Sequence, residues 1–205
     1  MSPPGPHPIE QPEDQGAALM LAWQGGDEGA FDQLVEAYSG RVYSLLTRFM
    51  GRSSSREDLV QEVFLRVIRA RDRYEPSARF TTWLYRITFN LAVNETRRSR
   101  GRAAWSLDQP LGDGEGGGGD VPDEGAPDPS DGLEQGDAVL AVRSAIAALP
   151  DQQRLALVLA KYHDMPYVEI GRVLGSSEKA IKSLIHRARE TLREHLALFL
   201  DEEIL

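Results

Sequence analysis

The 205-residue sequence contains no cysteine, which excludes a disulfide framework and any thiolate chemistry. No apolar run approaches the roughly 18 residues needed to cross a membrane. The first residues also lack the basic start and apolar core of a secretory signal. These absences predict a cytoplasmic protein with no membrane insertion.

Basic residues are missing from two long stretches of the chain. Residues 1–30 hold five acidic residues and no Lys or Arg, and residues 103–137 hold ten acidic residues and again none. Outside these stretches, 23 basic residues stand against 17 acidic ones, although the whole chain has a net charge of −9. The net charge must therefore be counted separately for each segment. Segment 31–102 alone has a net charge of +6, which suits a nucleic-acid partner.

Helical periodicity predicts an all-α fold. Apolar residues recur at helical spacing over 17–23, 27–50 and 55–74, and again over 80–102. The second half of the chain repeats this pattern over 138–149, 151–162, 166–174 and from 177 onward. Ser55 and Asp58 have the spacing of a capping box at the start of the third helix. That helix places Leu59 and Val63 inward and leaves a polar face outward.

The segments predict two small helical domains, an N-terminal helical bundle and a C-terminal helix-turn-helix, joined by a flexible acidic linker. The linker is rich in Gly and Pro and lacks the Lys-Ser/Thr of a phosphate loop. An acidic strand that mimics nucleic acid in a basic channel is the alternative for it. The expected boundaries are a disordered tail at 1–14, the first domain at 15–102, the linker at 103–136 and the second domain at 137–205.

The helix predicted over 80–102 carries two stripes. Phe80, Leu84 and Leu91 make an apolar stripe, whereas a polar and partly basic stripe contains Arg86 and Asn90 at the same spacing. Additional aromatic residues and a terminal arginine cluster give stacking surface beside amides and guanidiniums, which unpaired bases and phosphates require. The alternative is that the aromatic residues belong to the core and the arginines form a solvated helix end.

The segment from Pro166 onward has a helix-turn-helix pattern: a short helix, Gly175 in a position that favours left-handed backbone, a Ser cap and a second helix. The outward residues of the second helix are mostly basic, as expected of a helix in the major groove. An ordinary solvated helical hairpin is the alternative. His186 and Glu190 are interpreted as a surface pair, and the four histidines show no metal-ligand spacing. We therefore expect no catalytic residue, metal or cofactor.

Four blocks of the sequence resemble the extracytoplasmic-function (ECF) group of bacterial RNA polymerase sigma factors. They are DLVQEVFLRV at 58–67, FTTWLYRITFN at 80–90, LPDQQRLALVL at 149–159, and YVEIGRVLG followed by IKSLIHRARETL within 167–192. The blocks stand in the order of the family and span nearly all of the two predicted domains. The resemblance implies a sigma region 2-like domain, a sigma region 4-like domain and a function in promoter recognition and DNA melting.

The resemblance also implies site residues. The block that grips the polymerase clamp contains Asp58, Gln61, Glu62 and Phe64. The block that melts and reads the minus-ten element contains Arg79, Thr82, Trp83, Tyr85, Arg86, Asn90 and Asn94, followed by the phosphate-holding Arg97, Arg98 and Arg100. The minus-thirty-five recognition helix contains Ser177, Lys179, Lys182, Ser183, His186, Arg187 and Arg189. Leu184 and Lys179 depart from the common family pattern, so the bases that are read stay open.

The implied partners are the bacterial RNA polymerase core, through its clamp coiled coil and flap, promoter DNA, and an anti-sigma factor. The alternative function is a helix-turn-helix transcription regulator that does not act as a polymerase subunit. A clamp-binding block and a basic aromatic helix argue against that alternative, because a regulator with a separate sensor domain requires neither. The third hypothesis is an enzyme, but the sequence contains no cysteine nucleophile, no phosphate loop and no metal-ligand spacing among its histidines.

Overall fold

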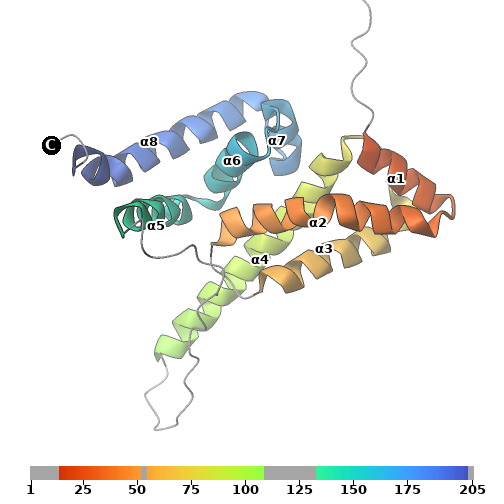
Figure 1. The fold of residues 1–205 in the computed structure, drawn as a ribbon, viewed down its shortest axis with the longest axis horizontal. Helices are drawn as coiled ribbons and strands as arrows, with labels where there is room; N and C mark the ends of the chain where they lie inside the picture. The colour runs from red at the N-terminus through yellow and green to blue at the C-terminus, as the bar shows by residue number, and fades with distance from the viewer. Residues whose placement is uncertain (1–13, 52–54, 109–132, 203–205) are drawn as a thin grey trace, which may run out of the picture.

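The computed structural model describes residues 14–51, 55–108 and 133–202, and within these ranges it is helical with no β-strand, as predicted. The first domain contains, in chain order, α1 (Gln15–Gln24), α2 (Glu28–Met50), α3 (Arg56–Ala70), the short 3-10 helix η1 (Arg71–Arg73) and α4 (Phe80–Asp108). The second contains α5 (Leu133–Ala148), α6 (Asp151–Tyr162), α7 (Tyr167–Leu174) and α8 (Glu178–Glu202) (Figure 1).

Most helix ends follow from the local sequence. Asp27 caps α2 by accepting a hydrogen bond from the Gly29 N–H at 3.1 Å, and Gly51 ends the helix with a positive φ of 69°. Ser55 directly precedes α3, as predicted, but its side chain does not cap the helix. Its backbone lies at φ −89° and ψ 8°, outside the extended conformation from which a capping hydroxyl reaches the first turn.

The long helix α4 continues to Asp108 and so includes the first six residues, 103–108, of the predicted linker. Ala103 and Ala104 favour helix, and the first proline after them is Pro110, so no helix breaker stands at 103. At the other side of the linker, α5 already begins at Leu133. The central part of the predicted linker, 109–132, and most of the predicted tail lie outside the described residues.

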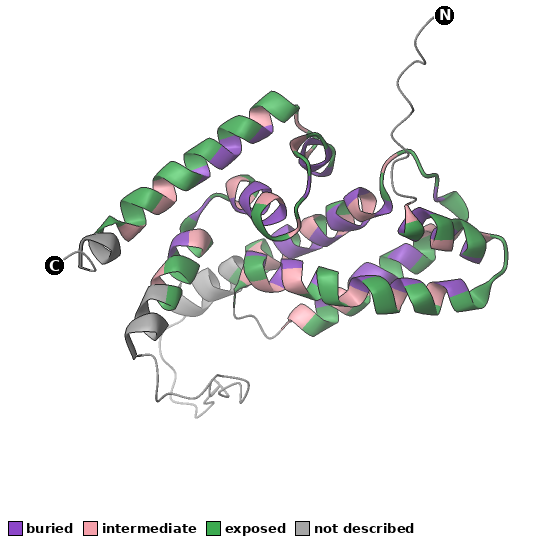
Figure 2. Cartoon of the chain, turned by 45° about the horizontal axis from the view of Figure 1, so that its top comes forward, coloured by how far each residue is buried: buried purple, intermediate pink, exposed green. Residues whose placement is uncertain are grey.

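Each domain buries the apolar stripes that its helices predict. In the first domain Leu34 and Phe49 of α2 pack with Val63 of α3 and with Phe80 and Leu84 of α4, and none is more than 2% exposed. In the second domain fully buried side chains from α6, α7 and α8 include Leu155, Leu159, Ile170 and Ile181. Figure 2 shows buried residues concentrated on the sides of the helices that face one another.

The two domains also pack against each other. α7 lies against the N-terminal part of α4, and α6 lies beside α2, whereas the C-terminal part of α4 extends away from the rest of the molecule (Figure 1). The buried apolar residues of the two domains form one continuous cluster. This packing is not encoded in any local pattern of the sequence, and it determines which of the predicted site residues are accessible.

Candidate nucleic-acid interface

The start of α4 is fixed by hydrogen bonds and by aromatic packing. The Asp14 carboxylate accepts from the Phe80 N–H at 2.6 Å and from the Ala17 N–H at 3.2 Å, so one side chain caps both α1 and α4. The Phe80 and Tyr38 rings are in contact, with their centroids 4.9 Å apart. The Trp83 ring lies edge-on to the Tyr74 ring, with the centroids 5.0 Å apart. Trp83 is therefore half-buried and belongs partly to the core, as the structural alternative held.

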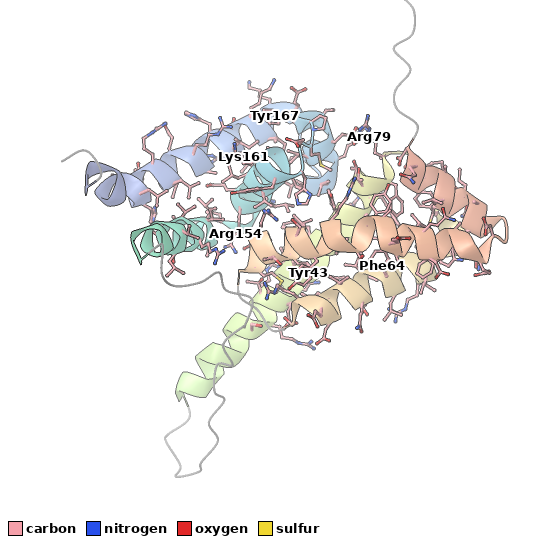
Figure 3. All side chains as sticks on the ribbon, in the orientation of Figure 1. Tyr43, Phe64, Arg79, Arg154, Lys161 and Tyr167 are labelled. Atoms are coloured by element: carbon pink, nitrogen blue, oxygen red, sulfur yellow. The ribbon has the colours of Figure 1, made fainter. Side chains whose placement is uncertain are left out.

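The polar stripe of α4 lies on the surface, as predicted. Arg86, Asn90 and Asn94 are exposed, and so are Arg97 and Arg98 one turn farther on. Arg98 makes a loose pair with Glu95 at 3.9 Å while its side chain stays 74% exposed. Arg79, just before the helix, is exposed as well (Figure 3). The side chain of Arg100 lies outside those that the structure describes.

Thr82 and Tyr85, predicted on the same DNA-facing surface, are only 4% and 3% exposed. The Thr82 hydroxyl donates to the Glu169 Oε2 of α7 at 2.7 Å, and the Tyr85 hydroxyl lies 3.0 Å from the His163 Nδ1. Both partners come from the second domain. The second domain therefore covers Thr82 and Tyr85, which the resemblance implies for the minus-ten site, whereas the polar stripe of α4 stays exposed.

Sequence reasoning did not identify Glu169 and His163 as site residues. Glu169 stands four residues before the buried Val173, so its position on the inward face of α7 was readable from helical spacing. Glu169 as a whole is 8% exposed, and its carboxylate also accepts a hydrogen bond from the Arg172 guanidinium at 2.7 Å. For His163, the C-cap residue directly after α6, no local pattern signals the contact, because its partner lies 78 residues earlier in the chain.

The surroundings of this contact are positively charged. Burial lowers the pKa of His163 below its usual value of 6.5, and the charges of Arg48 and Arg41 lower it further, while Asp164 acts in the opposite direction. Burial also raises the pKa of the Tyr85 hydroxyl to about 12, so it stays protonated at neutral pH. Arg79 and Glu169 line the adjoining cavity of about 170 Å³.

The turn between α7 and α8 has the geometry that the sequence predicts. Gly175 adopts the left-handed conformation with φ 64°, and the Ser177 hydroxyl caps α8 by accepting from the Ala180 N–H at 3.2 Å. Gly171 is needed for the close approach of the two helices, since a Cβ there would lie 2.5 Å from the Ser176 carbonyl oxygen. These contacts fix the angle at which α8 leaves the domain.

The outward face of α8 is confirmed residue by residue. All seven predicted minus-thirty-five residues are exposed: Ser177, Lys179, Lys182, Ser183, His186, Arg187 and Arg189. Lys182 is paired with Glu178 at 2.7 Å, and this hydrogen bond raises the pKa of the Lys182 ammonium. His186 and Glu190 form the predicted surface pair at 3.6 Å. Leu184 is buried, which explains why an apolar residue stands there.

On α3, Asp58 and Gln61 are exposed, and Glu62 bridges Arg66 at 3.1 Å and Arg69 at 3.5 Å. Phe64, predicted on this polymerase-facing surface, is instead 7% exposed and lies inside the domain (Figure 3). The helix is covered by α2 on one side and α4 on the other, so its buried stripe is wider than Leu59, Val63 and Val67 alone. The apolar side chains on the outer face are Leu65, 44% exposed, and Ile68, 42% exposed.

The described residues contain neither a metal-binding cluster nor a membrane-spanning helix. Within 14–51, 55–108 and 133–202, no cluster of three His or acidic side chains is placed to hold a metal ion. In the same ranges, no helix is both long enough and apolar enough to cross a membrane.

Two family models match separate parts of the chain. Residues 34–102 match the model of Sigma-70 region 2, and residues 140–192 match the model of Sigma-70, region 4. The first range contains α3 and the exposed stripe of α4, and the second contains the helix-turn-helix.

Relatives extend the similarity over most of the chain. The ECF RNA polymerase sigma factor SigE of Mycolicibacterium smegmatis is 35% identical over 196 residues, which are 91% of this chain and 70% of that protein. The ECF RNA polymerase sigma factor SigW of Bacillus subtilis is 32% identical over 177 residues, 83% of this chain and 91% of that protein. The chain belongs to the ECF family of RNA polymerase sigma factors. The predicted family is thereby confirmed.

A solved structure supports the fold of this ECF sigma factor. CnrH, determined in complex with the cytosolic domain of CnrY, superimposes with a TM-score of 0.63 at 26% identity, covering 90% of this chain and 99% of CnrH. As a sigma factor, the protein directs RNA polymerase to promoters at the initiation of transcription. Sigma factors are initiation factors and not classical enzymes.

Proposed function

We propose that this sigma factor recognises a two-part promoter with two separate helix faces, α4 for the minus-ten element and α8 for the minus-thirty-five element. The observation that carries the proposal is the pair of exposed faces, rich in amides, guanidiniums and ammoniums, on different domains of one chain. We assign residues 15–102 to the minus-ten domain and 137–205 to the minus-thirty-five domain.

The chemistry of α4 suits the capture of unpaired bases. Asn90 and Asn94 offer amide donors and acceptors for base edges, and they lie one turn apart on the exposed stripe. A base taken out of the duplex stack also needs an aromatic wall, for which Trp83 and Tyr85 are the candidates on this helix. Arg97 and Arg98 are placed to hold phosphates, which adds affinity without sequence information. Arg79, Thr82, Arg86 and Arg100 complete the proposed surface.

The chemistry of α8 suits the major groove. Its N-terminal side chains, including Lys179, Lys182 and Ser183, would meet base edges, whereas Arg187 and Arg189 lie farther along the helix and would hold phosphates. Ser177 and His186 belong to the same outward face. A recognition helix of 25 residues is much longer than the groove is wide, so only its first turns would contact bases.

We assign the outer face of α3 to the clamp coiled coil of the polymerase core. Asp58, Gln61 and Glu62 supply polar contacts there, and the exposed Leu65 and Ile68 supply apolar contacts beside the buried Phe64. The flap of the polymerase is the proposed partner of the second domain. Because CnrH was solved with the cytosolic domain of CnrY, we also propose an inhibitory protein, an anti-sigma factor, as a partner of this chain.

In this proposal the protein has no chemistry of its own and works in the cytoplasm, since it acts only by binding polymerase and DNA. The test is transcription reconstituted from purified bacterial core polymerase, this protein and a library of genomic fragments, with sequencing of the RNA 5′ ends. We expect starts that depend on the protein and share two spaced upstream motifs. If the folded protein does not bind core polymerase and yields no transcription start, the result would instead favour the helix-turn-helix regulator.

A further inference from the structure

The connection between α3 and α4, residues 71–79, leads directly into the surface that we assign to the minus-ten element. It ends with the exposed Arg79, and Trp83 follows within the first turn of α4. After η1 the connection has no regular secondary structure, although the Ser77 N–H donates to the Glu75 carbonyl at 2.8 Å. A segment of this kind needs contacts with other elements to hold one conformation.

The C-terminal end of α1 holds the start of the connection. The Gln24 side-chain amide donates to the Arg71 carbonyl and, at 3.0 Å, to the Tyr74 carbonyl. In the opposite direction, the Arg71 guanidinium donates to the Trp23 carbonyl at 3.0 Å and lies over the Trp23 ring at 4.7 Å. The Tyr74 ring in turn packs edge-on against the Trp83 ring. Gln24 therefore acts on Trp83 through a single intermediate residue.

The N-terminal end of α1 holds the other end of the connection. Both carboxylate oxygens of Asp14 are used: Oδ1 accepts from the Ala17 N–H of α1, and Oδ2 accepts from the Phe80 N–H of α4 at 2.6 Å. The Phe80 N–H stands at the start of its helix, where backbone donors have no acceptor within the helix. Gly16 permits this close approach, because a Cβ there would overlap the Phe80 ring.

One helix of ten residues therefore bonds both ends of the connection. α1 is about 15 Å long, and it lies beside η1 and the start of α4 (Figure 1). Met20 and Trp23, 0% and 4% exposed, fix α1 to the core of the domain. The match to Sigma-70 region 2 begins at residue 34, so α1 lies before the matched range.

We infer that α1 positions the minus-ten surface, with Asp14 and Gln24 as positioning residues that hold the connection in the conformation that presents Arg79 and Trp83. The inference rests on the proposed minus-ten role of these two side chains. A surface that is already ordered binds its ligand more tightly, because the loss of conformational entropy occurs on folding and not on binding. Neither Asp14 nor Gln24 needs to touch DNA for this effect.

Two substitutions disturb these bonds and keep α1 itself intact. Asp14→Asn leaves one acceptor oxygen in place of two, and Asn caps a helix as well as Asp does, so α1 can stay capped while the Phe80 N–H loses its acceptor. Gln24→Glu replaces the donor amide by a carboxylate that faces two carbonyl oxygens and repels them.

The chain offers a matched control for each substitution. Asp27→Asn changes a cap in the same way, but the Asp27 carboxylate accepts from the Gly29 N–H of α2 and leaves the connection alone. Gln33→Glu makes the same change of charge as Gln24→Glu on the exposed face of α2. Both control variants should behave as the wild type in the two measurements that follow.

The first measurement is amide hydrogen exchange of the full chain, without DNA or polymerase. In both Asp14→Asn and Gln24→Glu, we expect peptides that cover residues 71–83 to exchange about three- to tenfold faster, as expected for the loss of one hydrogen bond. Peptides of α2 should exchange as in the wild type, which excludes unfolding of the whole domain. Unchanged exchange over 71–83 in both variants would overturn the inference and leave the proposed function untouched.

The second measurement uses the complex of the full chain with core polymerase and a labelled single strand that carries the minus-ten motif found by transcript sequencing. We expect both variants to bind core polymerase normally and to bind the motif strand about three- to tenfold more weakly. Binding of a strand of mixed sequence, which depends on phosphate contacts, should not change. A general loss of stability would instead weaken all three interactions, and that result would count against a positioning role.

Normal binding of the motif strand by both variants would also overturn the positioning role, and Asn90→Ala shows whether the proposed function fails with it. Asn90 lies on the exposed stripe of α4, away from α1. If Asn90→Ala weakens binding of the motif strand, the minus-ten surface stands and only the role of α1 is refuted. If Asn90→Ala has no effect either, the assignment of this surface to the minus-ten element is wrong.

Discussion

The salt dependence of DNA binding by α8 tests the assignment of this helix most directly. Lys182 and Arg187 are both exposed, but their surroundings differ. Lys182 is already paired with Glu178 at 2.7 Å, whereas the Arg187 side chain donates to the Ser183 carbonyl at 3.3 Å. A phosphate must therefore displace an anion from Lys182 but not from Arg187. We expect Arg187→Ala to have the larger effect of the two single substitutions.

The magnitude follows from the release of counterions. Each phosphate contact contributes about 0.9 to the slope of log K against log salt, so loss of both contacts lowers the slope by up to about 1.8. Over a fourfold increase in salt, the wild-type protein then loses about 12-fold more affinity than the double variant. Arg187→Ala alone should lower this slope by close to 0.9. Lys182→Ala should lower it by less, because Lys182 is already paired with Glu178.

The assay is fluorescence anisotropy with the full chain and a labelled duplex that contains the upstream motif found by transcript sequencing, between 50 and 200 mM KCl. Arg66→Ala is the control, because this exposed arginine lies on α3 and pairs with Glu62. Its slope should equal that of the wild type. A double variant with an unchanged slope would refute the conclusion that the outward face of α8 holds DNA phosphates.

Four further predictions concern opening, stability and pH. Asn90→Ala with Asn94→Ala should slow promoter opening, measured by permanganate reactivity, and leave core binding unchanged; equal losses in both would contradict the assignment of this stripe to DNA. Arg154→Leu leaves three carbonyls without their donor and should lower the free energy of unfolding in urea by about 2–4 kcal/mol; a change below about 0.5 kcal/mol would mean that water replaces the guanidinium. Gly171→Ala should destabilise the second domain and lower its melting temperature, since the new Cβ meets the Ser176 carbonyl oxygen at 2.5 Å; a melting temperature equal to the wild type would show that the turn adjusts. Burial lowers the pKa of His163 below 6.5, so the folded protein favours the neutral form of its ring. The His163 contribution to the free energy of unfolding should be fully present above pH 6.5 and fall as the pH drops below it, and His163→Gln should remove this contribution, as measured by urea unfolding at several pH values.

Local sequence patterns were sufficient for the helices and for their exposed faces. Spacing alone placed Arg86, Asn90 and Asn94 on the surface of α4, and it placed the basic residues of α8 outward, because 3.6-residue periodicity relates position directly to face. Gly175 and Ser177 were identified as turn and cap for conformational reasons that do not depend on the rest of the fold. The resemblance to ECF sigma factors then supplied partners for these faces.

Burial that depends on more than one neighbour was not predictable in this way. Phe64 lies next to the inward Val63, and whether it is covered depends on how α2 and α4 flank α3. The burial of Thr82 and Tyr85 was not predictable, because the residues that cover them lie about 80 positions later in the chain. A polar hydrogen bond between distant segments leaves no periodic signal, so Glu169 was visible only as a carboxylate on an otherwise buried helix face.

The contact between the two domains has a polar part and an apolar part, because the buried apolar residues of both domains form one continuous cluster. Its hydrogen bonds each contribute about 0.5–1.5 kcal/mol net, and the stacking of Arg48 on Tyr162 about 0.5–1 kcal/mol, so the whole polar contact is worth a few kcal/mol. The apolar part of the contact adds to this, since α6 and α7 contribute buried side chains to the same cluster as α2 and α4. Removing one polar partner, such as Glu169 or Arg48, therefore weakens the contact between the domains without abolishing it.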